Sequence, residues 1–153
     1  EQGPVQPFVF NEQTAVVGEG AVFFVLTRDE AASYGHIDEV VLGNHEVCPI
    51  KLEQDEILII GADGHKDCGR WYAQAVEGHK SAAYAPLYGS FPAAAGFDLA
   101  AAALSLRDRR IYASPEPRDA MLAPAGSATQ VGMNLACLKF GPTGEYGLVR
   151  VSV

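Results

Sequence analysis

The chain has 153 residues, of which 48% are hydrophobic, and its formal net charge at pH 7 is -8. This length and composition predict one globular domain and exclude a disordered chain. The acidic balance and the absence of a basic tract exclude nucleic acid and an anionic membrane surface as the main partner.

Cysteine use and the lack of targeting signals predict a cytoplasmic protein. Three widely spaced cysteines without a Cys-x-x-Cys motif predict buried, reduced thiols; they are Cys48, Cys68 and Cys137. No charged-then-apolar leader and no run of about 18 apolar residues occurs, so we expect neither a signal peptide nor a membrane span. The first residue is Glu1, and we expect a fragment or a processed chain.

The first half of the chain predicts extended segments separated by one short helix. Residues 14–28 alternate in polarity and are rich in Val and Phe around a Gly pair, which predicts a strand, a tight bend and a second strand. Residues 29–35 predict one or two helical turns that end at a glycine. Residues 36–43 predict a strand, and residues 56–64 predict a buried strand of the parallel-sheet type.

The second half predicts helices that alternate with short strands. Residues 68–80 place apolar side chains at helical spacing, and residues 81–89 follow as a short strand. Residues 109–117 predict an edge strand stopped by prolines, and residues 128–153 predict a hairpin around a Pro/Gly turn. The order β, β, α, β, α, β, β indicates an α/β layered structure with a mixed sheet.

The helix predicted over residues 93–106 has almost no polar face. Its only ionisable residue is Asp98. A helix that is apolar all round normally lies inside a larger structure. We therefore expect it to pack between two layers, with these residues buried: Leu99, Ala102, Ala103 and Leu106.

Short motifs recur along the chain in a characteristic order. They are Pro-Phe at 7–8, Gly-Glu-Gly-Ala at 18–21, ILIIGADGHKD at 57–67, YGSFPAAAGFDLAAAALSLRDRRI at 88–111 and SATQVGMNLACLKF at 127–140. In these segments the chain resembles the β-ketoacyl synthase family. That family carries Gly-Glu-Gly-Ala, a His-Gly-Thr-Gly-Thr turn, a Gly-His-x-x-Gly-Ala-Ala-Gly helix and a closing Gly-Phe-Gly-Gly-Thr-Asn strand in the same order.

The resemblance implies a thiolase-like fold, in which two similar halves stack their sheets around a central layer of helices. It places residues 1–43 at the end of the N-terminal half and residues 44–153 in the C-terminal half. The helix over residues 93–106 would then lie in the central layer. The connection over residues 44–55 is shorter than the family's, which implies a divergent, trimmed member.

The resemblance also implies that the catalytic residues are lost. The family's first His falls on Asp63, its Lys on Ala85, its second His on Ser90 and a Phe near its C-terminus on Gln130. The Glu of the helix after the first motif falls on Gln74. No cysteine matches the nucleophile, whose segment lies upstream of the positions that match. A carboxylate at position 63 would repel the negative charge that develops on an enolate oxygen.

We therefore expect no catalytic residue, no metal and no cofactor, and a non-catalytic subunit that resembles a chain-length factor. It would pair with an active ketosynthase, or with itself, in fatty-acid or polyketide-type biosynthesis. Contact with an acyl carrier protein would fall on the basic cluster Arg107, Arg109 and Arg110. Two alternatives stay open. One is part of an active synthase or acyltransferase whose Cys-bearing half is absent, with Asp63, His65 and Ser90 in altered roles; the other is a stand-alone acyl- or protein-binding module.

Other candidate sites are weaker. Asp63, His65, Asp67 and Cys68, with His79, fit no familiar zinc spacing, which favours a polar turn. The glycines at 61, 64 and 69 lack the Gly-x-Gly-x-x-Gly of a nucleotide loop. Ser90 lacks a Gly-x-Ser-x-Gly motif and compelling His or Asp companions, so we expect a helix N-cap. We expect His36 and His45 on the surface.

Overall fold

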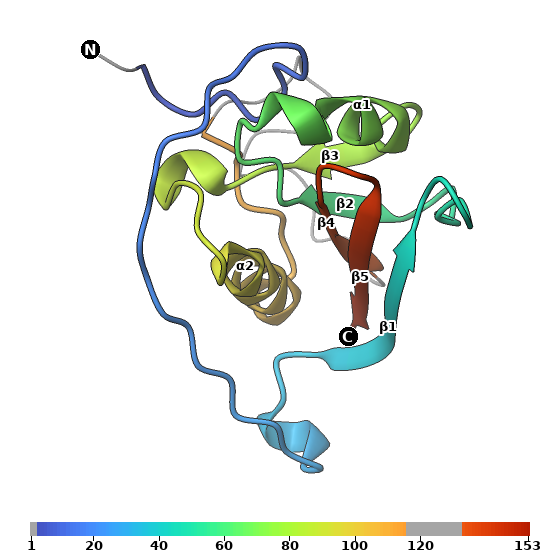
Figure 1. Ribbon diagram of the computed structural model, residues 1–153. Coiled ribbons are helices and arrows are strands. Elements are labelled where there is room, and N and C mark those ends of the chain that lie inside the picture. The colour runs from blue at the N-terminus through green and yellow to red at the C-terminus, as the bar shows by residue number, and fades with distance from the viewer. Residues whose placement is uncertain (1–2, 116–132) are drawn as a thin grey trace.

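A mixed five-stranded sheet with one helix against each face forms the centre of the molecule (Figure 1). The computed structural model describes residues 3–115 and 133–153. The strands, in spatial order, are β1 (His36–Asn44), β5 (Glu145–Ser152), β4 (Leu135–Phe140), β2 (Ile57–Ile60) and β3 (Lys80–Ala82). β2 is parallel to β3 and β4, whereas β5 is antiparallel to β4 and β1.

Alternation along the central strands supplies both halves of the core. In β2, Ile57 and Ile59 face α2 (Ala94–Asp108), while Leu58 and Ile60 face α1 (Lys66–Ala75). All four side chains are buried, which explains why β2 is continuously apolar. Two short 3-10 helices complete the described elements, η1 (Glu30–Ala32) and η2 (Ala85–Leu87).

Most of the expected elements are confirmed. The short helix after residue 28, the strand ending near residue 43, the buried strand, both long helices and the terminal hairpin are all present. The strand expected over residues 81–89 is confirmed only at its start, because β3 ends at Ala82 and the segment around Pro86 forms the 3-10 helix η2 instead. The α/β class with a mixed sheet is therefore correct. The register of β1 against β5 shifts between Ile37 and Glu39, so the pairing is regular from Glu39 to Asn44.

The strand pair expected over residues 14–28 is wrong. Among the described residues this segment forms a single bridge, between Val17 and Ser90, and otherwise runs beside α2 without strand partners. Side chains from the segment pack closely against the helix. A Cβ on Gly96, for example, would lie only 2.4 Å from the Val22 side chain. A helix has no free backbone groups along its side, so this contact offers no strand ladder.

The edge strand expected over residues 109–117 is also absent from its described part, residues 109–115. Side chains take the place of backbone pairing there. The Ser114 hydroxyl donates to the carbonyl oxygen of Ala83 at 2.6 Å, and the Tyr84 hydroxyl donates to the carbonyl oxygen of Tyr112 at 2.8 Å. Residues 116 and 117 lie outside the described residues, as does the first part of the expected hairpin.

α2 is buried on its sheet side, as expected, but only partly covered on the other. Ala102 and Leu106 are buried, whereas Leu99 and Ala103 are half-buried, so the expectation for these two is wrong. The physical reason is that, within the described part of the chain, the second layer over α2 is the irregular segment from residue 18 onward, which covers the helix incompletely. Asp98, the one ionisable residue of the predicted helix, is 2% exposed.

Candidate functional site

A polar network lies where β2 ends and the chain turns into α1. This is the carboxyl edge of the parallel strands, where ligands bind in open α/β sheets. Asp63 and His65 come from the turn itself, Ser90 from the loop before α2, and Lys139 from β4. Gln13 reaches the network from the N-terminal segment.

Asp63 is the central acceptor of this network. Its Oδ2 atom accepts from the Ser90 hydroxyl at 2.8 Å and from the Lys139 ammonium at 2.7 Å. The same ammonium donates to the carbonyl oxygen of Gly61 at 2.6 Å. Burial alone would raise the pKa of Asp63, but Lys139, the Ser90 hydrogen bond and His65 outweigh it and hold the pKa below its usual value. Asp63 is therefore an ionised carboxylate although only 6% of it is exposed.

His65 donates to Ser90, and Gln13 sets this direction. The backbone N–H of Lys66 donates to the Gln13 side-chain oxygen at 3.1 Å, so the Gln13 amide nitrogen is the atom 3.2 Å from His65 Nδ1. An amide nitrogen only donates, so Nδ1 must accept and the ring proton of neutral His65 lies on Nε2. Nε2 is 3.1 Å from Ser90 Oγ and donates to it.

Two expectations about Ser90 are therefore wrong. Ser90 has both a His and an Asp companion: His65 and Asp63, which precede it in the chain by 25 and 27 positions. It does not cap α2, whose N-cap is Ala93 without a side-chain cap hydrogen bond. The reason is that the loop holds Ser90 by its backbone instead: its N–H donates to Val16 O at 2.7 Å and its carbonyl accepts from Gly18 at 3.0 Å.

The N-terminal segment lies across this edge of the sheet as a strap, defined here as residues 10–18. The backbone N–H groups of Thr14 and Ala15 both donate to the carbonyl oxygen of Gly64, at 2.8 and 3.1 Å. Two glycines permit the strap to lie close to the neighbouring backbone. A Cβ on Gly18 would lie 1.8 Å from Tyr88 O, and a Cβ on Gly69 would lie 1.8 Å from Phe10 O. Any side chain there would push the strap away.

A second buried carboxyl, Asp98 of α2, lies behind the network. The Tyr88 hydroxyl donates to its Oδ1 atom, and the Asp98 backbone carbonyl accepts from the Cys137 thiol at 3.8 Å. Burial raises the pKa of Asp98 to about 7, against the lowering effects of the Tyr88 hydrogen bond and the Lys139 charge. Burial also raises the pKa of Tyr88, with Asp98 adding to that shift.

Lys139, Gln13 and Tyr88 belong to the site but were not predicted from the sequence. Lys139 carried one signal, a lone basic residue in the otherwise apolar stretch of β4. Gln13 and Tyr88 carried none. Of the other expected positions, Ala85 is buried in η2, Gln74 is exposed on α1, and Gln130 lies outside the described residues.

The remaining candidate residues lie elsewhere. Cys68 and Cys137 are buried and free as expected, and burial raises the pKa of both thiols, but Cys48 is exposed because it follows β1 in a surface turn. His36 is exposed, whereas His45 is half-buried against Trp71 and Phe140. Within residues 3–115 and 133–153, no three His, Cys, Asp or Glu side chains gather as metal ligands would. Neither long helix of this described part has the length and hydropathy for a membrane crossing.

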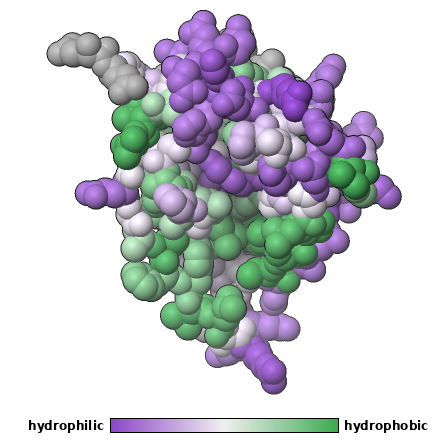
Figure 2. Space-filling view, viewed as in Figure 1, coloured by the Kyte–Doolittle hydropathy of each residue, from purple (hydrophilic) through white to green (hydrophobic). Residues whose placement is uncertain are grey.

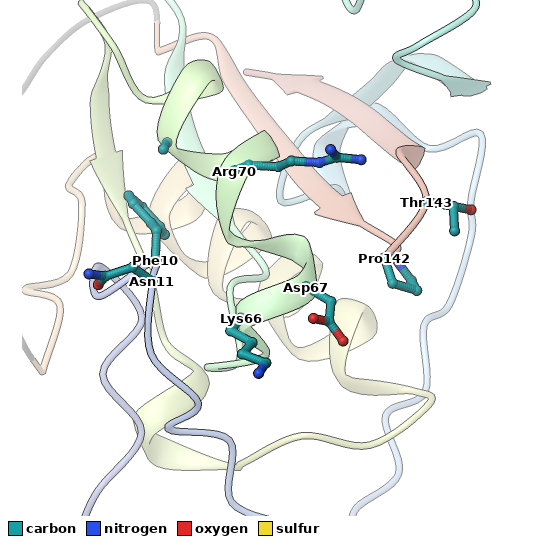
Figure 3. Close-up of a pocket in the computed structure, with 8 residues that line it drawn as sticks. Phe10, Asn11, Lys66, Asp67, Arg70, Pro142 and Thr143 are labelled. Carbon is teal, nitrogen blue, oxygen red and sulfur yellow. The ribbon is translucent and has the colours of Figure 1, made fainter.

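An open hollow of about 740 Å³ lies between α1 and the turn that joins β4 to β5 (Figure 3). Lys66, Asp67 and Arg70 line it from the helix, and Arg70 extends toward the turn. Arg70 already pairs with Glu46 at 3.0 Å and lies over the Trp71 ring. The hollow does not include Asp63, Ser90 or Lys139, so it is separate from the network.

Comparison with known proteins identifies the fold. No family model and no curated protein matches the chain. A solved structure that does match is the ketosynthase from module 1 of the bacillaene synthase from Bacillus amyloliquefaciens FZB42, with a TM-score of 0.55 and 12% identity. The match covers 78% of this chain and 30% of that chain, so the chain spans about a third of the length of this ketosynthase. The chain therefore has the ketosynthase-like, thiolase-type α/β fold over part of that length.

Proposed function

We propose that this chain is a non-condensing, ketosynthase-like subunit of fatty-acid or polyketide-type biosynthesis that pairs with an active ketosynthase, as a chain-length factor does. The observation that carries the proposal is the charge and environment of Asp63. By the resemblance it stands at the first catalytic His, and it is an ionised carboxylate held by Lys139 and Ser90.

The electrostatics at Asp63 oppose condensation. Decarboxylation of a malonyl thioester puts negative charge on an enolate oxygen, which needs hydrogen-bond donors. Here the ammonium of Lys139 is neutralised by Asp63, and the proton of the Ser90 hydroxyl is committed to the same carboxylate. Removing one such donor typically costs about two to three orders of magnitude in rate.

An exposed apolar face supports the pairing. Figure 2 shows apolar side chains gathered over the part of the molecule that holds the segment beside α2, the helix itself and β1. Its exposed members are Phe23, Val25, Leu26, Val40, Leu42 and Leu104. Large apolar patches on a protein surface mark interaction sites, so this face suits a ketosynthase-like partner or a second copy of the chain.

The charge distribution supports unequal contributions of the two subunits to acyl-carrier-protein binding. With a net charge of -8, this chain is a poor principal surface for an acidic acyl carrier protein. Arg107, Arg109 and Arg110 lie together at and just beyond the C-terminal end of α2 and would make its contribution to that contact. The partner would supply most of the basic surface.

A second candidate function, acyl transfer at Ser90, is favoured by one observation. Ser90 lies within hydrogen-bond distance of both His65 and Asp63, as the serine of a hydrolase lies near its base. The hydrogen-bond direction opposes it, because His65 Nε2 donates to Ser90 and so has no lone pair there to receive the serine proton. A fluorophosphonate probe tests this candidate, since it labels only an activated serine.

The decisive experiment measures malonyl-thioester decarboxylation and condensation by this chain, by an active ketosynthase, and by both together. We expect no turnover by the chain alone and a changed rate or product length in the pair. The control is the chain with Val47→Asp, an exposed residue in the turn after β1. Turnover by the chain alone that is lost in Ser90→Ala would replace the proposal with the second candidate.

A further inference from the structure

One ammonium group lies near two buried carboxyls at the end of β2. Gly61 shows how close they are, because a Cβ at this glycine would lie 2.7 Å from Lys139 Cδ and 3.0 Å from Asp98 Oδ2. The Lys139 side chain and the Asp98 carboxyl therefore lie close to each other over the Gly61 backbone. Lys139 Nζ is two bonds beyond Cδ, and it currently donates to Asp63 and to Gly61 O.

Alternation along β4 places these groups on one face of the sheet. Cys137 belongs to the core cluster on the α2 side and Leu138 to the cluster on the α1 side. Lys139 is the next residue and therefore returns to the α2 side, where Asp98 is buried. The Lys139 side chain is 31% exposed, so it retains room to move, whereas the side chain of Asp63 is 9% exposed.

The charged and titratable groups around Asp98 come from three places. The loop around η2 contributes Tyr88, which donates to Asp98, and Tyr84; burial raises the pKa of Tyr84 and Asp98 adds to the shift. β4 contributes Lys139 and Cys137, and the turn after β2 contributes Asp63. β2 and β5 contribute apolar residues to the core cluster on this side: Ile57, Ile59, Val149 and Val151. Lys139 is the single cation among the described groups that face Asp98.

We propose that Lys139 is a shared cation, which holds Asp63 while Asp98 is neutral and moves toward Asp98 when Asp98 ionises. Two carboxylates and one ammonium cannot all be paired at one time with Lys139 in its present position. The pKa of Asp98, which burial raises to about 7, sets the change near neutral pH. This inference goes beyond the proposed function, because it requires neither a partner nor an acyl substrate.

Movement of Lys139 would reach the strap through Ser90. Asp63 holds the Ser90 hydroxyl, and the Ser90 backbone holds the strap at Val16 and Gly18. When Asp63 loses its ammonium, its pKa rises, and the side chain that still donates to it among the described residues is that of Ser90. The backbone amides of the strap and of the turn after β2 are therefore expected to be less protected from hydrogen exchange above neutral pH than below it.

Nuclear magnetic resonance of the whole chain tests the inference, with carboxyl carbons of Asp and the ammonium nitrogen of Lys observed during a pH titration. We expect Asp98, Asp63 and Lys139 to shift with one common midpoint near neutral pH. In Asp98→Asn, the shifts of Asp63 and Lys139 should be flat across neutral pH. The matched control is Lys66→Met, an exposed lysine on α1, which should leave the common midpoint unchanged.

Two outcomes would overturn the inference. One is a neutral-pH transition at Asp98 during which Lys139 and Asp63 do not move. The other is a transition at Lys139 that persists in Asp98→Asn. If Asp98→Asn fails to fold, Tyr88→Phe takes its place. Losing the Tyr88 hydrogen bond raises the pKa of Asp98, so the midpoints seen at Asp98 and Lys139 must rise by the same amount. Separate midpoints would contradict the shared cation.

Discussion

Ser90 shows how the direction of a hydrogen bond decides what a residue can do. A serine nucleophile donates to a base that has a free lone pair, and a third group holds that base in the right tautomer. Here Gln13 holds His65 in the opposite tautomer, so His65 donates to Ser90. The same three residue types thus give a structural bridge to Asp63 in place of a nucleophile.

The first residue-scale prediction reverses that direction with Gln13→Glu. A carboxylate at position 13 would still accept from the Lys66 N–H, and it would favour the His65 tautomer whose Nδ1–H donates a hydrogen bond to it. His65 Nε2 would then face Ser90 with a lone pair. We expect the nitrogen resonances of His65 to report the other tautomer, and labelling of Ser90 by a fluorophosphonate to exceed that of the native chain. Ser90→Ala is the control, and an unchanged tautomer would contradict the role of Gln13.

The second residue-scale prediction concerns the pair of Lys139 and Asp63. Lys139→Met leaves a buried carboxylate without its cation, which should lower the free energy of unfolding at pH 7 by about 2–4 kcal/mol. The exposure of Lys139 keeps the loss below that of a fully buried pair. Urea denaturation measures it. The control, Glu46→Gln, breaks the exposed pair with Arg70 and should cost under about 1 kcal/mol. Equal losses in both variants would contradict the prediction.

At the scale of elements, α2 carries a buried acid whose titration should make stability depend on pH. Folded Asp98 keeps its proton up to about pH 7, whereas its unperturbed pKa is 3.8. Between these values the folded state binds more protons, so the free energy of unfolding falls as pH rises. The full effect is at most about 4 kcal/mol. Asp63 has a lowered pKa, so its effect is confined to more acidic solutions.

Asp98→Asn tests this dependence. The asparagine keeps an oxygen that accepts from Tyr88 but has no proton to lose. Urea denaturation at several pH values should show that the loss of stability between acid and neutral pH is smaller in the variant than in the native chain. Asp108→Asn, in the last turn of α2, is the control and should keep the native slope. A native slope in Asp98→Asn would show that Asp98 is not the group that titrates.

Elements with local signals could be predicted, and the others could not. β2 and α2 could be predicted because a short continuous apolar run favours a buried strand and a long one favours a buried helix. Residues 14–28 have a strand-like sequence, but a strand exists only where another strand pairs with it, and the described segment lies beside a helix. The network at Asp63 had no local signal, because Asp63 and Lys139 are 76 positions apart in the chain.

At the scale of the molecule, the two faces of the sheet are covered unequally. On the α1 side, side chains such as Phe8, Phe10 and Ile50 pack around the helix and extend the core. On the α2 side, Val40 and Leu42 of β1 project from an edge strand that no described helix covers. Phe23 and Val25 are 91% and 92% exposed near the same side. Exposed apolar side chains on an edge strand favour association with another chain.

The last prediction is that this face drives association, either with a ketosynthase-like partner or between copies of the chain. Leu42→Glu places a charge on β1 where the side chain is 82% exposed, so it should leave the fold intact and weaken the complex. Sedimentation velocity with increasing concentration, with and without an active ketosynthase, measures the change. Val47→Asp, equally exposed in the next turn, is the control and should associate as the native chain does. The net charge of -8 opposes contact between copies, so high salt should strengthen self-association more than pairing with a basic partner. A native chain that stays monomeric under every one of these conditions would contradict both the prediction and the proposed pairing.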